Sequence, residues 1–292
     1  MSSQLLEISE EMVRNTIPPR RRSSHKGENG RVLVVGGGRI FHGAPIFAAL
    51  GAYRAGVDVV YVASPEKVSN AIRAFSPSLI VFPLPDVKLT EGCANIIVKN
   101  IEKGVLKVDS AVIGPGLSGS SRHIAFLAYK LSSLNIKLVL DAAALKKEIV
   151  EKISGRDVVL TPHEFEFYRM FGEKLEKELE KRAEVVKRYA SEFQVTILLK
   201  GMMDVISDGR TVLINKTGSP GMTVGGTGDV LAGLIAGFMA RGLRPLEAAF
   251  VGAYVNGLAG EAISKKKGFH FLTEELIEEL PNVLKRFDKV ID

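Results

Sequence analysis

The sequence predicts an α/β protein in which a mostly parallel sheet carries helices on both faces. Short runs of consecutive apolar residues alternate with longer helical segments along the chain, and such runs are typical of parallel strands that are buried on both sides. The 292 residues, of which 46% are hydrophobic, suffice for one large core. We find no internal repeat, low-complexity tract or long linker. We therefore expect one domain over residues 1–292.

The predicted strands are the apolar runs, such as R-V-L-V-V at residues 31–35. Their uncharged composition suits a strand that is covered on both faces. Two further runs flank the turn Asp208-Gly209 and predict an antiparallel hairpin over 203–207 and 211–215. The runs expected to form the parallel sheet are residues 31–35, 57–62, 79–82, 110–113, 137–140, 158–160 and 196–199.

Helices are predicted between these strands, where apolar residues recur at helical spacing. Residues 44–55 are rich in alanine, and residues 175–193 form a long amphipathic pattern. Pro65 is expected to open a short helix, because proline is tolerated in a first helical turn. The other predicted helices are residues 91–102, 123–134, 230–240, 245–265 and 273–285.

Glycines and polar side chains stand at the carboxyl ends of the predicted strands. Ligands of parallel α/β sheets bind beyond these ends. A single strand end of this kind is weak evidence, but several that meet at one edge predict a ligand-binding rim. The strand ends concerned are Gly36-Gly37-Gly38, Gly114-Pro115-Gly116, Asp141, Thr161-Pro162-His163 and Lys200-Gly201.

The most informative segment is residues 215–231, which read N-K-T-G-S-P-G-M-T-V-G-G-T-G-D-V-L. Its glycines allow the backbone to approach a ligand closely, and the helix that follows offers unpaired N–H groups to a phosphate. Asp229 would repel that anion, so we interpret it as a base that takes a proton from a hydroxyl group. The alternative is that Asp229 only caps the helix.

Five other residues have both a structural and a functional interpretation. His163 is either a structural histidine or a ligand contact, and Glu166 could be an ordinary acid of a first helical turn. Lys200 either faces a phosphate or is solvated. Asp141 is either a helix N-cap or part of the ligand rim. For Asn256, inside an apolar helix, we favour a hydrogen bond in the core over a contact with a nucleotide.

Several kinds of site are disfavoured. The strand that leads into Gly36 and Gly38 resembles a dinucleotide-binding fingerprint, but Phe41 occupies a position that requires a small residue. The pattern G-x-x-x-x-G-K-[ST] of a phosphate-binding P-loop is absent from the sequence. The five histidines show no metal-ligand spacing. We therefore expect neither a dinucleotide dehydrogenase nor a zinc site.

Composition gives broader limits. The single cysteine, Cys93, excludes an internal disulfide and favours the cytoplasm, and we see no membrane span or secretory signal. A net charge of +6 suits nucleotides and other polyanions. Because no aromatic residues are interleaved with the basic cluster Arg20-Arg21-Arg22, nucleic-acid binding has little support, and we interpret this cluster as a solvated arm.

Seven motifs in order make the chain similar to the NAD(P)H-hydrate dehydratase family of the ribokinase-like fold. The G-G-T-G-D-V-L-A-G element alone would indicate only the wider superfamily, and its combination with the other motifs is specific. The resemblance covers a core of about residues 17–285. The motifs are H-K-G-E-N-G-R-V-L-V-V-G-G at 25–37, F-H-G-A at 41–44, I-G-P-G-L at 113–117, L-V-L-D-A at 138–142, L-T-P-H-E-F-E-F at 160–167, L-L-K-G at 198–201 and G-S-P-G-M-T-V-G-G-T-G-D-V-L-A-G at 218–233.

The resemblance implies a three-layer α/β/α sandwich and a repair enzyme. The substrate would be the S-form of NADH or NADPH hydrate, which carries a hydroxyl at C6 of the nicotinamide ring. ADP or ATP would phosphorylate that hydroxyl, and elimination of phosphate would restore NAD(P)H. Magnesium would neutralise the nucleotide phosphates, although no residue stands out as its ligand.

Carried over motif by motif, the resemblance implies that Asp229 is the catalytic base and binds the hydrate together with Ala44, Gly116 and His163. The backbone amides of residues 226–228 would hold the developing charge. The residues expected to bind the nucleotide are Lys200, Gly201, Asn215, Thr217, Gly218, Thr223, Gly226, Thr227 and Gly228.

The chain departs from the family in two respects. Ala143 stands where the family commonly has a second aspartate, in the pattern L-D-A-D-A-L. Many relatives also carry an N-terminal epimerase domain, which we do not expect here, so a separate epimerase would interconvert the R and S hydrates. By resemblance we expect a homo-oligomer, with a tetramer as the candidate state.

Two other functions remain open from the sequence. The same Gly-Asp element would serve a vitamin-precursor kinase of the same superfamily, and a nucleotide sensor without catalysis is a third class. A stable phosphorylated alcohol as product would indicate the kinase. The sequence decides neither between ADP and ATP nor between the NADH and NADPH hydrates.

Overall fold

A computed structural model describes residues 5–292. Residues 1–4, which begin the segment in which we saw no secretory signal, lie outside this range. The described chain forms a ten-stranded sheet in the order β1-β11-β10-β9-β8-β7-β6-β3-β4-β5. Only β10 runs antiparallel to its neighbours. The strands are β1 (Leu6–Glu7), β3 (Arg31–Val35), β4 (Val59–Pro65), β5 (Ile80–Leu84), β6 (Ser110–Ile113), β7 (Lys137–Leu140), β8 (Val158–Leu160), β9 (Thr196–Leu199), β10 (Asp204–Ser207) and β11 (Val212–Asn215).

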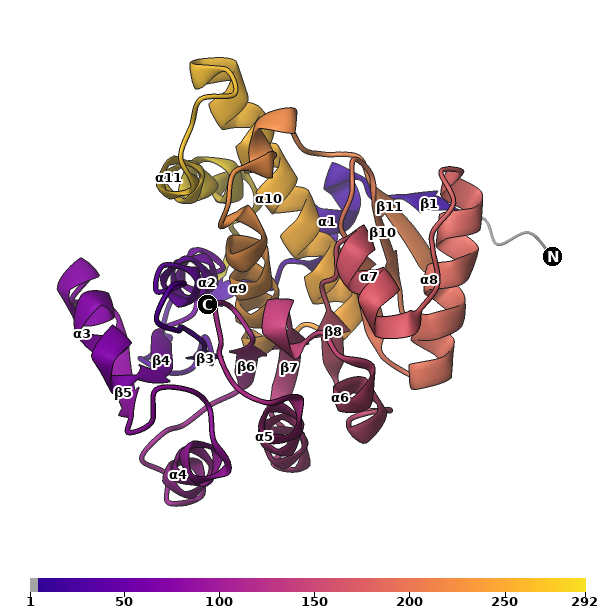
Figure 1. The fold of residues 1–292 in the computed structure, drawn as a ribbon. Helices are drawn as coiled ribbons and strands as arrows, with labels where there is room; N and C mark the ends of the chain where they lie inside the picture. Colours follow the sequence, from indigo (N-terminus) through magenta and orange to yellow (C-terminus); the bar gives the residue numbers. More distant parts are fainter. Residues whose placement is uncertain (1–4) are drawn as a thin grey trace.

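Helices cover both faces of this sheet, as Figure 1 shows with the sheet between two helical layers. One layer contains α2 (Ala44–Arg54), α3 (Glu66–Phe75), α9 (Thr227–Ala240), α10 (Pro245–Lys267) and α11 (Thr273–Leu284). The other contains α4 (Glu91–Glu102), α5 (Ser121–Ser133), α6 (Lys147–Lys152), α7 (Glu164–Phe171) and α8 (Leu179–Phe193). The predicted three-layer α/β/α architecture is therefore confirmed.

Two hydrophobic cores explain why the strands lack a polar face. Successive side chains of a strand point to opposite faces, so Val32 and Val34 of β3 pack into the core beneath α2 and α9. Leu33 and Val35 of the same strand pack into the core beneath α4 and α5. The apolar positions of a central strand are thus buried in one core or the other, which produces the uninterrupted apolar runs.

Some predicted boundaries were wrong. The strand predicted at 57–62 begins at Val59 and continues to Pro65, because Asp58 accepts hydrogen bonds from the loop amides of Gly27 and Asn29. The helix predicted at 175–193 begins at Leu179. Helix α7 was not predicted as a separate element, although its His163–Glu166 cap is visible in the sequence.

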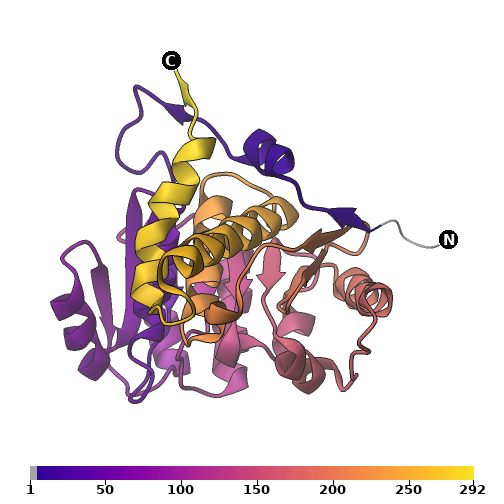
Figure 2. The ribbon, with the colours of Figure 1, turned by 90° about the horizontal axis from the view of Figure 1, so that it is seen from above.

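The remaining elements lie mostly at the chain ends. Helix α1 (Glu10–Thr16) follows β1, and β2 (Arg20–Arg21) pairs in parallel with β12 (Val290–Ile291). Figure 2 shows this small pair beside the end of α11. Three short 3-10 segments are η1 (Ala142–Ala144), η2 (Pro220–Thr223) and η3 (Lys285–Phe287). Within residues 5–292, no helix combines the length and the apolar character that a membrane span requires.

Candidate active site

Two helices begin side by side beyond the carboxyl ends of the strands. A Cβ on Gly233 of α9 would lie only 1.9 Å from the carbonyl oxygen of Ala48 in α2, so the two backbones touch. At the start of α9, Gly226 has a φ of +108° and lies against the ring of Phe47. Because the first N–H groups of each helix have no intrahelical partner, the paired starts of α2 and α9 can hold negative charge.

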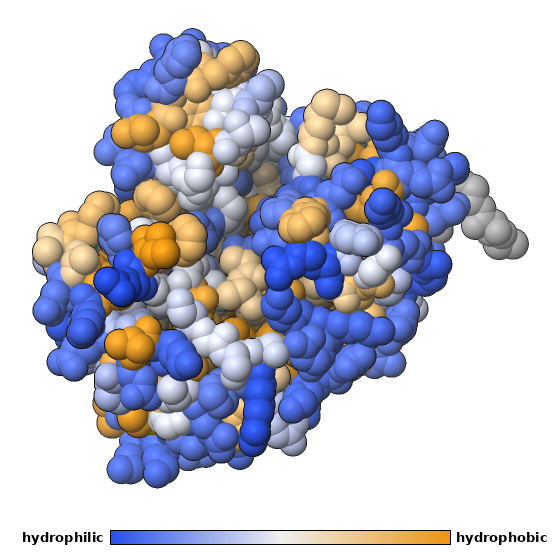
Figure 3. Space-filling model, viewed as in Figure 1, coloured by the Kyte–Doolittle hydropathy of each residue, from blue (hydrophilic) through white to orange (hydrophobic). Residues whose placement is uncertain are grey.

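Two predicted substrate residues meet at the start of α2. A Cβ on Gly116 would lie 3.2 Å from the Cβ of Ala44 and 2.4 Å from the carbonyl oxygen of Phe41. Gly116 also has a φ of +62°, so a larger residue would be strained and would clash. Phe41, whose carbonyl oxygen faces Gly116, is largely exposed and was not among the predicted site residues, and Ile40 before it in the chain is exposed as well. An apolar pair inside a glycine-rich loop was the signal available. Figure 3 shows that this face of the molecule is hollowed between α11, α2 and α7.

Lys200, which follows β9, connects the strand ends to the start of α9. Its Nζ lies 3.1 Å from Asp141 Oδ1 and 3.9 Å from Glu166 Oε2. A Cβ on Gly228 would lie 3.4 Å from the same nitrogen. Burial lowers the pKa of the Lys200 ammonium, but the carboxylates of Asp141 and Glu166 outweigh this effect and raise it. Lys200 is thus a charged, mostly buried side chain and not the solvated lysine that the sequence left open.

Asp141 lies at the carboxyl edge of the sheet beside Lys200 and caps no helix by its side chain. It stands at the N-cap of η1 without a side-chain capping hydrogen bond. Its carboxylate, 3% exposed as a residue, accepts instead from the hydroxyl of Thr161 at 2.8 Å. Ala143, where the family commonly has a second aspartate, lies in η1 directly after it.

Asp229 occupies the first turn of α9 and faces this cluster. Burial, and after it the Asp141 carboxylate, raise the pKa of its carboxyl from 3.8 to about 7, although Lys200 opposes the rise. A group with a pKa near neutrality can both accept and return a proton under cellular conditions. This environment favours the interpretation of Asp229 as a base over that of a simple cap.

His163 and Glu166 form the N-terminal cap of α7. His163 Nδ1 accepts from the backbone N–H groups of Phe165 and Glu166, at 3.2 and 3.3 Å. Glu166 accepts in return from the N–H of His163 at 2.9 Å. In neutral His163 the proton therefore resides on Nε2, and the imidazole can donate a hydrogen bond to a substrate. Glu166 is more than the first-turn acid considered from sequence, because it also faces Lys200.

The predicted nucleotide loop is braced from within. The amide of Asn215 is buried and donates to Asp204 at 3.0 Å, while its oxygen accepts from the hydroxyl of Thr217 at 2.9 Å. Both side chains therefore shape the loop, and the N–H of Gly218 donates to Glu261 at 3.1 Å. Thr223 is exposed at the end of η2.

Two further predicted residues lie at the root of α9. The hydroxyl of Thr227 donates to the carbonyl oxygens of Met222 and Val224, so it ties η2 to the helix. Asn256 is buried in α10 and donates to the backbone oxygen of Thr227 at 3.4 Å. The predicted core position of Asn256 is confirmed, and its hydrogen bond to Thr227 helps to hold the start of α9 in place. Gly201 donates its N–H to Asp204, which anchors the turn after Lys200.

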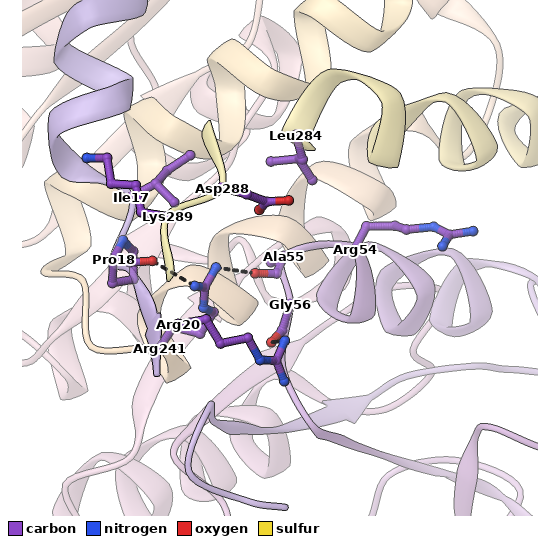
Figure 4. A pocket seen from close by; sticks show the side chains of 10 residues that line it. All are labelled: Ile17, Pro18, Arg20, Arg54, Ala55, Gly56, Arg241, Leu284, Asp288 and Lys289. Atoms are coloured by element: carbon purple, nitrogen blue, oxygen red, sulfur yellow. Dashed lines mark hydrogen bonds between the residues drawn. The ribbon is translucent and has the colours of Figure 1, made fainter. Parts of the chain in front are cut away.

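A separate cavity of about 80 Å³ lies at the opposite ends of α2 and α9. There the Arg241 guanidinium donates to the carbonyl oxygens of Ala55 and Pro18 (Figure 4). Cations stabilise the carboxyl ends of helices, so this basic cavity has a structural explanation. Arg20 pairs with Asp58 at its edge, while Arg21 and Arg22 are exposed, in agreement with a largely solvated arm.

The fold and this site define a class. A mostly parallel sheet that carries helices on both faces, with a glycine-rich turn and an aspartate at the start of a helix beyond its strand ends, agrees with the ribokinase-like fold. The sequence profile of NAD(P)H-hydrate dehydratase matches residues 32–282. The chain therefore belongs to the NAD(P)H-hydrate dehydratase family, as its motifs predicted.

Individual relatives support this assignment. The ADP-dependent (S)-NAD(P)H-hydrate dehydratase of Cenarchaeum symbiosum is 50% identical over 97% of this chain and 98% of its own length. A crystal structure of the ADP/ATP-dependent enzyme of Bacillus subtilis, co-crystallised with ATP/Mg2+, is 30% identical and has a TM-score of 0.83 over 98% of this chain and 99% of that one. The bifunctional NAD(P)H-hydrate repair enzyme of Pyrobaculum aerophilum is 43% identical over 92% of this chain, which spans 53% of that relative.

Proposed function

We propose that this protein uses ADP to dehydrate the S-form of NAD(P)H hydrate to NAD(P)H. Its family membership supports the reaction class, and a relative of nearly equal length with 50% identity carries this name. The observation that carries the proposal is Asp229. Its carboxyl, with a pKa of about 7, stands at the start of α9 within a glycine-rich turn.

The reaction is difficult because hydroxide is a poor leaving group. In the proposed first step, Asp229 takes the proton of the C6 hydroxyl while the hydroxyl oxygen attacks the terminal phosphorus of ADP, and AMP leaves. The C6–O bond of the resulting phosphate ester then breaks as the ring nitrogen donates its electron pair. Phosphate departs, and loss of a proton from the neighbouring carbon restores the dihydronicotinamide.

The two substrates are assigned to opposite sides of Asp229. The hydrate would lie against Ala44, Gly116 and His163, and the first two of these residues meet at the start of α2. The free N–H groups at the start of α9 would hold the transferred phosphoryl group. The residues proposed for the nucleotide are Lys200, Gly201, Asn215, Thr217, Gly218, Thr223, Gly226, Thr227 and Gly228, with the Asn215 and Thr217 side chains acting through the shape of the loop.

Magnesium fits this site as a companion of the nucleotide. Among residues 5–292, no group of three or more His, Cys, Asp or Glu side chains could hold a metal ion. Mg²⁺ commonly keeps several waters and binds through substrate phosphates, so the helix starts and Lys200 would hold it indirectly by holding the phosphates. When bound, the ion would neutralise negative charge on the nucleotide phosphates.

Replacement of the base tests the proposal. We expect Asp229→Asn to lower kcat by about 10²- to 10⁴-fold, the usual contribution of a general base. The assay combines NADH hydrate, magnesium and either ADP or ATP, and it follows dihydronicotinamide absorbance together with released phosphate. The exposed Asp157→Asn variant serves as control. Full activity of Asp229→Asn would remove this residue as the base, and a stable phosphorylated alcohol with wild-type protein would indicate a kinase instead.

Three wider assignments belong to the same proposal. We take residues 1–292 as one catalytic domain with a core of about residues 17–285, since all the long strands share one sheet. A reducing cytoplasm suits a chain whose single cysteine, Cys93, is free and buried. A homo-oligomer stays a prediction from the resemblance, and light scattering measures it directly.

A further inference from the structure

The position of the Lys200 ammonium beside Asp229 needs an explanation. Its Nζ lies against Gly228, the residue before Asp229, yet within the described residues it forms ion pairs with Asp141 and Glu166 and none with Asp229. The lysine is therefore held at the start of α9 without neutralising the acid there.

This arrangement affects the base directly. An ammonium paired with a carboxylate stabilises the ionised form and lowers the pKa of the carboxyl. A weaker base drives proton transfer less well. Lys200 already opposes the raised pKa of Asp229 from its present position, and a direct pair would oppose it more.

We propose that Asp141 is a positioning residue whose carboxylate holds the Lys200 ammonium and prevents it from pairing with Asp229. This inference rests on the proposed role of Asp229 as the catalytic base. Glu166 assists at the longer distance of 3.9 Å. Asp141 touches no reacting atom in this assignment and acts only through the lysine.

Asp141 is built as a fixed anchor. Its carboxylate is buried and is fastened by the hydroxyl of Thr161. Its backbone is equally confined, because a Cβ on Gly114 would lie 1.8 Å from the Asp141 carbonyl oxygen. The next residue, Ala142, has a φ of +47°, a conformation that a non-glycine residue rarely adopts. An anchor held from both sides can keep a flexible lysine in one place.

Loss of the Asp141 charge should lower the pKa of Asp229 in two ways. The like charge that helps to raise the Asp229 pKa disappears, and Lys200 becomes free to pair with Asp229. The charged and titratable groups that face Asp229 are Asp141 from the end of β7, Lys200 from the end of β9, and Glu166 with its partner His163 from α7.

A double-mutant cycle separates these two contributions. The carboxyl carbon of Asp229 is followed by ¹³C NMR titration of the free protein, and its signal is assigned by its absence in Asp229→Asn. We expect a wild-type midpoint near pH 7 and a midpoint lower by about one pH unit or more in Asp141→Asn. In the Lys200→Met background, the same Asp141→Asn change should lower the midpoint by much less.

Two controls accompany the cycle. Asparagine keeps an oxygen that can accept from Thr161, and circular dichroism verifies the fold. Thr161→Val removes that hydrogen bond and keeps the Asp141 charge, so its midpoint should stay near the wild-type value. Asp141→Glu restores the charge and should return the midpoint toward pH 7.

The outcomes distinguish this inference from the proposed function. An equal shift from Asp141→Asn with and without Lys200 would mean that Asp141 acts only through its own charge, and the positioning role would be refuted. An unchanged midpoint in Asp141→Asn would refute it as well. Failure of the dehydratase assay with an intact cycle would instead remove the proposed function while the Asp141–Lys200 coupling stands.

Discussion

The raised pKa of Asp229 has a consequence for stability as well as for catalysis. Ionisation of this carboxyl in the folded protein is unfavourable, because its pKa is about 7 against an ordinary 3.8. A rise of about three pH units corresponds to about 4 kcal/mol, at about 1.4 kcal/mol per unit. The side chain is partly exposed, so solvent screening reduces this figure, and we expect about 2 kcal/mol.

The sign follows from proton binding. Between pH 4 and pH 7 the folded protein keeps the Asp229 proton while the unfolded chain releases it. The free energy of unfolding therefore falls as the pH rises through this window. Asparagine cannot ionise, so residue 229 of the Asp229→Asn variant does not lower the free energy of unfolding as the pH rises. We predict that Asp229→Asn is more stable than the wild type by about 2 kcal/mol at pH 8 and equally stable at pH 4.

Urea denaturation at pH 4 and pH 8 measures this difference, and thermal unfolding should show a Tm higher by about 3 °C for the variant at pH 8. The exposed Asp157→Asn variant is the matched control and should show no such pH dependence. If Asp229→Asn is equally or less stable than the wild type at pH 8, ionisation of this buried carboxyl does not destabilise the folded protein, and the reasoning is wrong.

Two further predictions concern the start of α9 and its neighbours. Gly233→Ala should destabilise the fold by about 2 kcal/mol or more in urea denaturation, because its Cβ would fall 1.9 Å from the oxygen of Ala48. Gly225→Ala is the control, since a Cβ there meets nothing within 4 Å, and equal destabilisation by both changes would contradict the close packing of α2 on α9. Lys200→Gln should weaken nucleotide binding about tenfold or more in calorimetry, because an ammonium at the start of α9 attracts phosphate. Unchanged affinity would place Lys200 outside the nucleotide site.

The sequence predicted the layers well because the periodic signal was strong. A strand such as β3 is buried on both faces, so residues 32–35 form an uninterrupted apolar run. The ends of strands were harder to predict where a side chain accepts hydrogen bonds from the backbone of a neighbouring loop. Asp58 holds the loop before β4 through two amides, and its pattern of neighbours is visible only in three dimensions.

The candidate site was only partly predictable for a related reason. The glycine-rich turn and Asp229 are contiguous in sequence, so their shared chemistry could be read directly. Asp141, Glu166 and Lys200 come from three different strand ends, and each alone has a common structural explanation. From the sequence alone, Lys200 could therefore be interpreted either as a solvated side chain or as one that faces a phosphate.

What joins these residues is the geometry of the parallel sheet. Strands β7, β8 and β9 are neighbours in register, so the residues that follow them are brought to one edge although they lie far apart in the chain. The resulting cluster holds one ammonium among three carboxylates. Burial is the main cause of the raised Asp229 pKa, and the Asp141 and Glu166 carboxylates add to it. The proposed basicity of Asp229 therefore depends on residues that the edge of the sheet brings together, and it cannot be assigned to the Gly-Asp motif alone.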